Sequence, residues 1–298
     1  MSGTPAPQII VAGDAMTDLL AALSTPLAWG SDTPARTTRR WGGSALNTAI
    51  WASRTGRRVG LAARVGDDDP GRDCRAHLSA AGVLTAVVTT PGSETGACVV
   101  LVSPDGERSM IPDPGANLGW SHRDIPPEWW PQARWLHVSM YGLLRPQTRT
   151  EYQRAIALAR DHRLGVSVDV ASSEPLRAED GATRLREIGS VDLLLGTAEE
   201  LAVLGRPGHR TRAAIAQAAR TFAETVVVKC GPDPAVWLSG SGMWQVAPEP
   251  VAIVDSTGAG DAFAAGLLDA HLADAAPPDC LAAGHALAAR AIIGFGGH

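Results

Sequence analysis

Several features that often identify a function are missing from this sequence of 298 residues. It contains a single lysine, Lys229, and its formal net charge of -5 argues against non-specific nucleic-acid binding, which needs basic surface to displace counterions. Its four cysteines show no Cys-x-x-Cys or Cys/His spacing, so neither a disulfide framework nor a zinc site is expected. No apolar run is long enough for a membrane span, and the first residues lack the regions of a signal peptide. The sequence therefore predicts a soluble, cytoplasmic protein.

The common catalytic motifs are missing as well. The chain contains no Gly-x-x-x-x-Gly-Lys-[Ser/Thr], and no Gly-x-Gly-x-x-Gly follows its first predicted strand. It has no Gly-x-Ser-x-Gly nucleophile motif, and its eight histidines show no His-Glu-x-x-His or other metal-ligand spacing. A P-loop NTPase, a dinucleotide oxidoreductase, an α/β-hydrolase and a histidine-based metal site are therefore disfavoured.

What the sequence does contain is a regular alternation of short apolar segments with amphipathic ones. VDLLLG (191–196) and TVVVKCG (225–231) barely alternate in polarity, which is typical of strands buried on both faces. SALNTAIWASRTG (44–56) and QTRTEYQRAIALARDH (147–162) instead place their apolar residues at helical spacing. Repeated strand–helix alternation predicts an α/β fold in which helices cover a mostly parallel sheet.

Two regions interrupt this alternation. Residues 19–40 show no helical pattern, and TGACVVLVSPDGERSMI (95–111) predicts a β-hairpin that turns at 104–107. We expect both regions to form one small sheet that acts as a lid over the carboxyl ends of the main strands. The expected boundaries are 1–18, 41–93 and 117–298 for the core, and 19–40 with 94–116 for the lid. The alternative is two unrelated surface excursions.

The stretch VDSTGAGDAFAAGL (254–267) carries the clearest chemical signal. A glycine-rich turn that leads into a helix leaves backbone N–H groups unbonded, and the helix dipole favours an anion there. The amides of Gly258, Ala259, Gly260 and Asp261 are expected to converge on a phosphate, which small residues allow to approach. Asp261 would then take the proton of a hydroxyl nucleophile. The alternative is an aspartate that the dipole alone favours in a first helical turn.

Five segments in order resemble the ribokinase-like carbohydrate kinases, the PfkB family. DSTGAGDAFAAG (255–266) is similar to the C-terminal signature of that family, and WGGSALNTA (41–49) is similar to its N-terminal signature. VAGDAMTD (11–18) resembles its first strand, and RVGDDDPGRDCRAHLSAAGV (64–83) and PDPGAN (112–117) also fall where the family has similar segments. The resemblance spans essentially the whole chain. It implies a ribokinase-like three-layer α/β/α core with a mostly parallel sheet and a small β-sheet lid.

The resemblance also implies a sugar site. Asp18 matches the substrate-binding aspartate of the family and can accept hydrogen bonds from two hydroxyls at once. Gly42 and Gly43 would let the backbone approach a polyol, and Asn47 offers both a donor and an acceptor. Taken singly, Asn47 is typical of a helix start and Asp18 of a cap or turn. The further candidates for substrate contacts are Asn117, Met140 and Tyr141.

On the nucleotide side, TAEE (197–200) corresponds to a family segment that usually reads Asn-x-x-Glu. Glu200 matches the glutamate that helps to hold the magnesium–phosphate assembly, but Thr197 stands at the asparagine position. Glu200 could instead be a solvated helix residue. Lys229 and Gly231 match the strand and turn that border the adenine nucleotide.

The phosphate-binding turn adds Thr257, Gly258 and Gly260 to the expected nucleotide contacts. Asp255 lies where the family often binds a monovalent cation, so potassium is a candidate activator. The resemblance thus implies ATP-dependent phosphoryl transfer to a hydroxyl, with Mg²⁺ bridging the phosphates.

The expected substrate is less closely defined. Ribokinases usually have Gly-Lys-Gly-Ala-Asn where this chain has Gly-Ser-Ala-Leu-Asn, so a hexose or keto-sugar acid is expected in place of ribose, with a nucleoside as the alternative. Arg108 in the hairpin would pair a substrate carboxylate or phosphate, or be a solvated charge. A sugar-binding protein without catalysis, motivated by Thr197, is a hypothesis of a different class. The family also implies a homodimer that forms through the lids.

Overall fold

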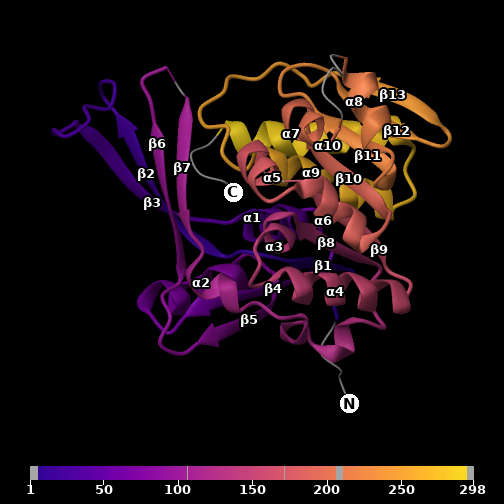
Figure 1. The fold of residues 1–298 in the computed structure, drawn as a ribbon, viewed down its shortest axis with the longest axis horizontal. Coiled ribbons are helices and arrows are strands. Elements are labelled where there is room, and N and C mark those ends of the chain that lie inside the picture. Colours follow the sequence, from indigo (N-terminus) through magenta and orange to yellow (C-terminus); the bar gives the residue numbers. More distant parts are fainter. Residues whose placement is uncertain (1–5, 106, 171, 206–210, 294–298) are drawn as a thin grey trace.

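A sheet of nine strands forms the centre of the molecule (Figure 1). In the computed structural model, which describes residues 6–105, 107–170, 172–205 and 211–293, the strand order is β13-β12-β11-β10-β9-β8-β1-β4-β5. All strands from β11 to β5 are parallel, and β12 and β13 add an antiparallel edge. The bounds are Ile9–Ala12 (β1), Val59–Gly66 (β4), Leu84–Thr90 (β5), Trp135–Ser139 (β8), Gly165–Asp169 (β9), Val191–Thr197 (β10), Ala223–Lys229 (β11), Ala235–Ser239 (β12) and Gly242–Val246 (β13).

Helices pack on both faces of this sheet and create two separate apolar cores. One face carries α1 (Ser44–Ser53), α2 (Asp69–Ala80), α9 (Ala259–Leu272) and α10 (Pro277–Ile292). The other carries α3 (Tyr141–Leu144), α4 (Arg149–Asp161), α5 (Ser173–Ala178), α6 (Gly181–Ile188), α7 (Ala198–Leu204) and α8 (Arg212–Ala219). Apolar side chains that alternate between the faces of β8, β10 and β11 enter both cores, which explains why these strands show so little alternation. The three-layer α/β fold predicted from the sequence is confirmed.

A second, four-stranded sheet projects away from the large one, as Figure 1 shows. It joins β2 (Met16–Leu23), β3 (Ala35–Gly42), β6 (Gly96–Val102) and β7 (Arg108–Asp113) in the order β3-β2-β6-β7. The parallel pairing of β2 with β6 brings the two interrupting regions together. Strand β2 begins at Met16, two residues before the boundary expected at residue 18, so Asp18 lies in this small sheet. In the predicted turn between β6 and β7, Gly106 lies outside the described residues.

Polar side chains gather where the parallel strands end. Ser139 ends β8 beside Asp169, the last residue of β9, and Thr197 ends β10 beside Lys229, the last residue of β11. This edge of the sheet is where open α/β folds bind ligands, because side chains and helix starts converge there. No helix within the described ranges is long and apolar enough to cross a membrane.

Candidate active site

The start of α9 leaves backbone amides unbonded. Gly258, the residue before the helix, has a φ of 73°, a left-handed conformation that favours glycine. The amide of Ala259 donates to the carbonyl of Ser256 at 3.3 Å and is therefore already engaged. Within the part of the chain that the structure describes, the amides of Gly258, Gly260 and Asp261 donate no hydrogen bond. Three of the four amides predicted to receive a phosphate thus remain available to an anion.

Both oxygens of the Asp261 carboxylate accept hydrogen bonds from α1. Ser44 Oγ donates to Oδ1 at 2.7 Å, and Asn47 Nδ2 donates to Oδ2 at 2.9 Å. Gly43 precedes α1 with a φ of 94°, and a Cβ there would lie 2.4 Å from the carbonyl oxygen of Asp14. Glycine at this position therefore lets α1 begin close to the end of β1. The two signature segments meet at one carboxylate.

Burial raises the pKa of Asp261 to about 7. The hydrogen bonds from Asn47 and Ser44 favour the charged form and oppose this rise, while the charge of Asp169 adds to it and that of Lys229 lowers it. A carboxyl group with a pKa near neutral pH is ionised often enough to accept a proton and basic enough to hold it. The geometry and the pKa together suit a general base beside an anion site.

Asp18 lies on the buried face of the small sheet and is 8% exposed. Burial raises the pKa of its carboxyl to about 6, and no hydrogen bond to this carboxylate is formed within the described ranges. A Cβ at Gly42 would lie 2.1 Å from Asp18 Oδ2, so the glycine makes room for the carboxylate. A buried carboxylate without donors costs free energy unless a ligand supplies them. Sugar hydroxyls are such donors.

The other candidates for substrate contacts differ in their surroundings. Asn117 is buried, with 1% of its surface exposed. Its Oδ1 accepts from the amide of Ala15 at 3.2 Å, and its Nδ2 donates to the carbonyl oxygens of Ala15 and Pro114. It fixes the turn between β1 and β2 and has little capacity left for a ligand. Met140 is fully buried in the apolar core. Tyr141 is half-buried, and its hydroxyl donates to Ser172 Oγ at 3.1 Å.

A cavity of about 650 Å³ opens beside the start of α9, where Ala259 and Gly260 line it. This volume is in the range of sites for nucleotide-sized ligands. Its lining includes Lys229, Gly231 and Gly260, and most of its wall is apolar, with side chains from α9 and α10. Helix α10 contributes Ala288, Ala289 and Ile292 to this wall, and residues 294–298, which follow it, lie outside the described part of the chain. The apolar lining residues include Val251, Ile253, Phe263, Ala288 and Ile292.

Thr197 and Glu200 form a capping box at the start of α7. The Thr197 amide donates to Glu200 Oε2 at 2.7 Å, and the Glu200 amide donates to Thr197 Oγ1 at 3.2 Å. The asparagine position of the family segment is thus taken by a residue that starts the helix. Burial raises the pKa of Glu200, although the Lys229 charge opposes the rise. Oε2 of Glu200 is engaged in the capping box, and among the described residues no hydrogen bond is formed to Oε1, which could therefore bind a ligand.

Asp255 is bound by an arginine of the lid. Oδ1 of Asp255 accepts from Nη2 of Arg108 at 2.6 Å and from both the amide and the hydroxyl of Thr257. Nη1 of Arg108 also donates to Ser256 Oγ. Arg108 is therefore neither a solvated hairpin charge nor open to a substrate anion, which were the two sequence-based expectations. The Arg108 guanidinium thus forms an ion pair with the Asp255 carboxylate, at which a monovalent cation was expected. The residues present therefore fit that cation poorly.

Two residues that contact the predicted site residues, Ser44 and Asp169, were not predicted from the sequence. Ser44 follows the paired glycines and lies three residues before Asn47, a helical spacing that places both on one face of α1. Asp169, at the end of β9, accepts from Lys229 Nζ at 2.9 and 2.7 Å. The spacing of Ser44 was a readable signal, whereas no local pattern links Asp169 to Lys229.

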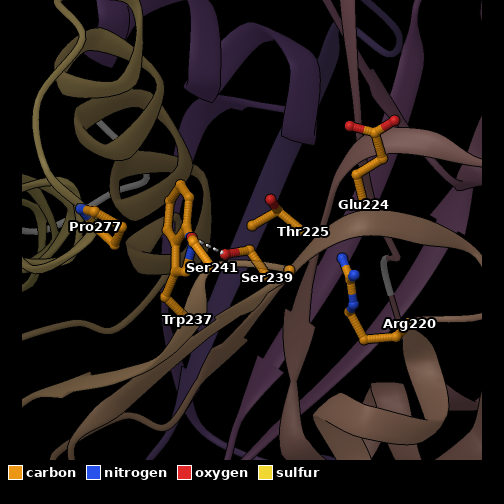
Figure 2. A pocket seen from close by; sticks show the side chains of 8 residues that line it. Arg220, Glu224, Thr225, Trp237, Ser239, Ser241 and Pro277 are labelled. Atoms are coloured by element: carbon orange, nitrogen blue, oxygen red, sulfur yellow. Dashed lines mark hydrogen bonds between the residues drawn. The ribbon is translucent and has the colours of Figure 1, made fainter.

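A second hollow of about 410 Å³ lies at the opposite end of β11 (Figure 2). It is lined by Glu224 and Thr225 from the start of that strand, with Trp237 and the hydrogen-bonded pair Ser239 and Ser241 from the antiparallel edge. None of the predicted site residues lines it. The chemistry therefore concentrates at the carboxyl edge of the sheet.

Comparisons with known proteins show the family to which the chain belongs. The family model for the pfkB family carbohydrate kinases matches residues 6–297. A fructokinase of Klebsiella pneumoniae is 31% identical over 283 residues, covering 93% of this chain and 88% of the relative. An aminoimidazole riboside kinase of Salmonella typhimurium is 29% identical over 238 residues, covering 76% and 72%. A solved structure of a fructokinase with bound ATP from Xylella fastidiosa superposes with a TM-score of 0.82 at 25% identity and covers 97% of this chain and 93% of that one.

Proposed function

Since the chain belongs to the pfkB family of carbohydrate kinases, we propose that it transfers a phosphoryl group from ATP to a sugar hydroxyl held between Asp18 and Asp261. One observation carries this proposal above all. Asp261, with its carboxylate oriented by Ser44 and Asn47, stands next to the unbonded amides that begin α9. A base and an anion site within one turn of a helix are the two parts that hydroxyl phosphorylation requires.

The steps follow from these groups. Asp18 and the backbone beside Gly42 orient the sugar so that one hydroxyl faces Asp261. Asp261 accepts the proton of that hydroxyl as its oxygen attacks the terminal phosphorus. The amides of Gly258 and Gly260 donate to the phosphoryl oxygens, on which charge develops as the bond to the leaving oxygen breaks. Closure of the small sheet over the substrate would exclude water from this reaction.

ATP is proposed to occupy the 650 Å³ cavity, with its base against the apolar wall and its phosphates toward Gly260. Magnesium, when bound, neutralises phosphate charge, and it usually keeps most of its ligands from phosphates and water. The donor set fits this role. Glu200 has one carboxylate oxygen free to hold a magnesium-bound water, and the Thr197 hydroxyl can still donate to a phosphate.

The test is ADP production with Mg-ATP across hexoses, pentoses, keto-sugar acids and nucleosides. A hexose or keto-sugar acid is the proposed substrate, and a nucleoside is the second candidate because a riboside kinase is among the similar proteins. The reaction is expected with one class and not with the others. Tight sugar binding without ADP production at saturating Mg-ATP would instead support a non-catalytic sugar-binding protein.

Potassium is not part of the proposed reaction. Asp255 already has its charge matched by Arg108, so turnover is expected to be equal in sodium-only and potassium buffers of the same ionic strength. Steady-state rates in the two buffers test this expectation. The Arg108→Gln variant serves as the comparison. It removes the guanidinium that pairs with Asp255, so its rate is expected to depend on potassium. Clear activation of the unaltered chain by potassium would contradict it.

We also propose that two chains associate through the small sheets. Leu19, Val99 and Ile111 are in register on the face opposite Asp18, and they are 44%, 36% and 59% exposed. A contiguous apolar sheet face of this kind is usually covered by another chain. Sedimentation at micromolar concentration is expected to give a dimer, and Ile111→Glu is expected to give a monomer. A monomer for the unaltered chain would remove this proposal.

A further inference from the structure

The single lysine of the chain ends in a buried ion pair. Lys229 Nζ lies 2.9 Å and 2.7 Å from the two carboxylate oxygens of Asp169, and the two side chains are 12% and 7% exposed. A buried pair of this kind is weak evidence for stability, because the desolvation of both charges offsets their attraction. Apolar residues of similar size would serve a core equally well. Stability alone therefore does not explain why the chain has this ion pair.

The ammonium group also adjoins the anion site. A Cβ at Gly260 would lie 3.1 Å from Lys229 Nζ, so the lysine reaches the first turn of α9, where amides are unbonded. Lys229 and Gly260 both line the 650 Å³ cavity. An ammonium group has three donors, and Asp169 accepts from it with two oxygens. One donor remains for an oxygen of a ligand in the anion site.

The surrounding charges keep this lysine protonated. Burial alone would lower its pKa, but Asp169, Glu200 and Asp261 together raise it above the ordinary value. The charged groups that act most strongly on Lys229 are these three carboxyl groups, so a phosphoryl group beside them gains from the positive charge of the lysine. A fixed cation at this point favours the charge that develops during transfer.

We propose that Lys229 is a catalytic residue that binds the transferred phosphoryl group, and that Asp169 is the positioning residue that aims its ammonium group at the anion site. This inference rests on the proposed function and assigns Lys229 to the phosphates, where the sequence analysis had placed it along the nucleotide in general. In the step, the hydroxyl oxygen bonds to the terminal phosphorus and the bond from that phosphorus to the bridging oxygen breaks. The hydroxyl proton passes to Asp261, ADP leaves with the bond electrons, and Lys229 keeps its proton.

The test must distinguish a loss of phosphate binding from a loss of stability. A variant that removes the charges of Lys229 and Asp169 together makes this distinction. Lys229→Met alone leaves Asp169 buried and unpaired, so its melting temperature is expected to fall. The double variant Lys229→Met/Asp169→Asn also removes the carboxylate that pairs with the lysine, and it is expected to recover most of that melting temperature. Turnover of the double variant should nevertheless fall about a hundredfold, the effect of losing one donor to a developing oxyanion.

Nucleotide binding supplies a readout that does not depend on turnover. Calorimetric titration in Mg²⁺ would compare ADP with the β,γ-methylene analogue of ATP. The double variant should lose about tenfold or more in affinity for the analogue, with ADP affinity nearly unchanged, because only the analogue carries the terminal phosphoryl group. Asp169→Asn, which keeps the lysine, should retain analogue binding and lower turnover about tenfold, since the ammonium loses its fixed direction.

The outcomes distinguish the failures. A double variant that turns over and binds the analogue like the unaltered chain would overturn the role of Lys229 and leave the kinase proposal intact. An unaltered chain that binds neither nucleotide would overturn both. If the double variant does not fold, Asp169→Asn decides the question, because unchanged turnover in that variant would remove the positioning role.

Discussion

Replacement of Asp261 by asparagine is expected to lower turnover about a thousandfold without disturbing the fold. The amide has the shape of the carboxylate and can still accept the hydrogen bond from Ser44, but it cannot take a proton from the substrate hydroxyl. The measurement is ADP production at saturating sugar and Mg-ATP. Asp269→Asn, on the same helix α9, is the matched control, because Asp269 pairs with Arg57 at the far end of the helix. Near-normal turnover in Asp261→Asn would rule out the proposed base.

The pH dependence follows from the raised pKa of Asp261, about 7. The base must be ionised to act, so kcat/KM is expected to fall as the pH is lowered through 7 and to level off above it. The effect on stability has the opposite sign. Between the ordinary aspartate pKa of 3.8 and about 7, the folded chain holds a proton that the unfolded chain has released, so this group lowers stability as the pH rises through that window.

Asp261→Asn should therefore melt at a higher temperature than the unaltered chain at pH 8, and at nearly the same temperature below pH 4. Thermal unfolding at both pH values checks this expectation. A variant that loses turnover while gaining stability at pH 8 would identify Asp261 as a residue kept for chemistry at a cost in stability. Equal loss of stability at both pH values would instead point to disrupted packing.

The second large effect is expected at Asp18. Asp18→Ala should lower kcat/KM for the sugar about a thousandfold, since hydrogen bonds from two hydroxyls to a charged group contribute about 1.5–3 kcal/mol each. Most of the loss should appear in KM, because these bonds hold the sugar before and during transfer alike. Burial raises the pKa of Asp18 to about 6, so the sugar KM of the unaltered chain should also rise as the pH falls through 6.

Asp32→Ala is the control for this variant. Asp32 lies in the exposed connection between β2 and β3 of the same small sheet, so its loss removes an equal charge from the lid without touching the buried face. Steady-state kinetics with the substrate found in the panel would compare the two. An unchanged KM in Asp18→Ala would mean that the sugar binds elsewhere, whatever the outcome at Asp261.

The sequence by itself determined the elements and their order. Periods of apolar residues set strands and helices because each element must bury one face or both, and this needs no knowledge of the partner. The GAGD turn and the Gly-Gly pair were readable for a similar reason: a left-handed or closely packed backbone position favours glycine locally, as Gly258 and Gly43 do. The family, the α/β class and the small sheet followed from such local signals.

Only the tertiary structure decided which side chains meet. Ser44 lies 217 positions from Asp261, Arg108 lies 147 positions from Asp255, and Asp169 lies 60 positions from Lys229. Asn117 likewise matched a family segment, yet its amide is engaged by the backbone of Ala15. Residue spacing along the chain determines neighbours within one element, whereas contacts between elements depend on strand order and on the angle at which a lid meets the core. Those are set by the packing of the whole molecule, so the partners of the base and the pairing of Lys229 with Asp169 became visible only in three dimensions.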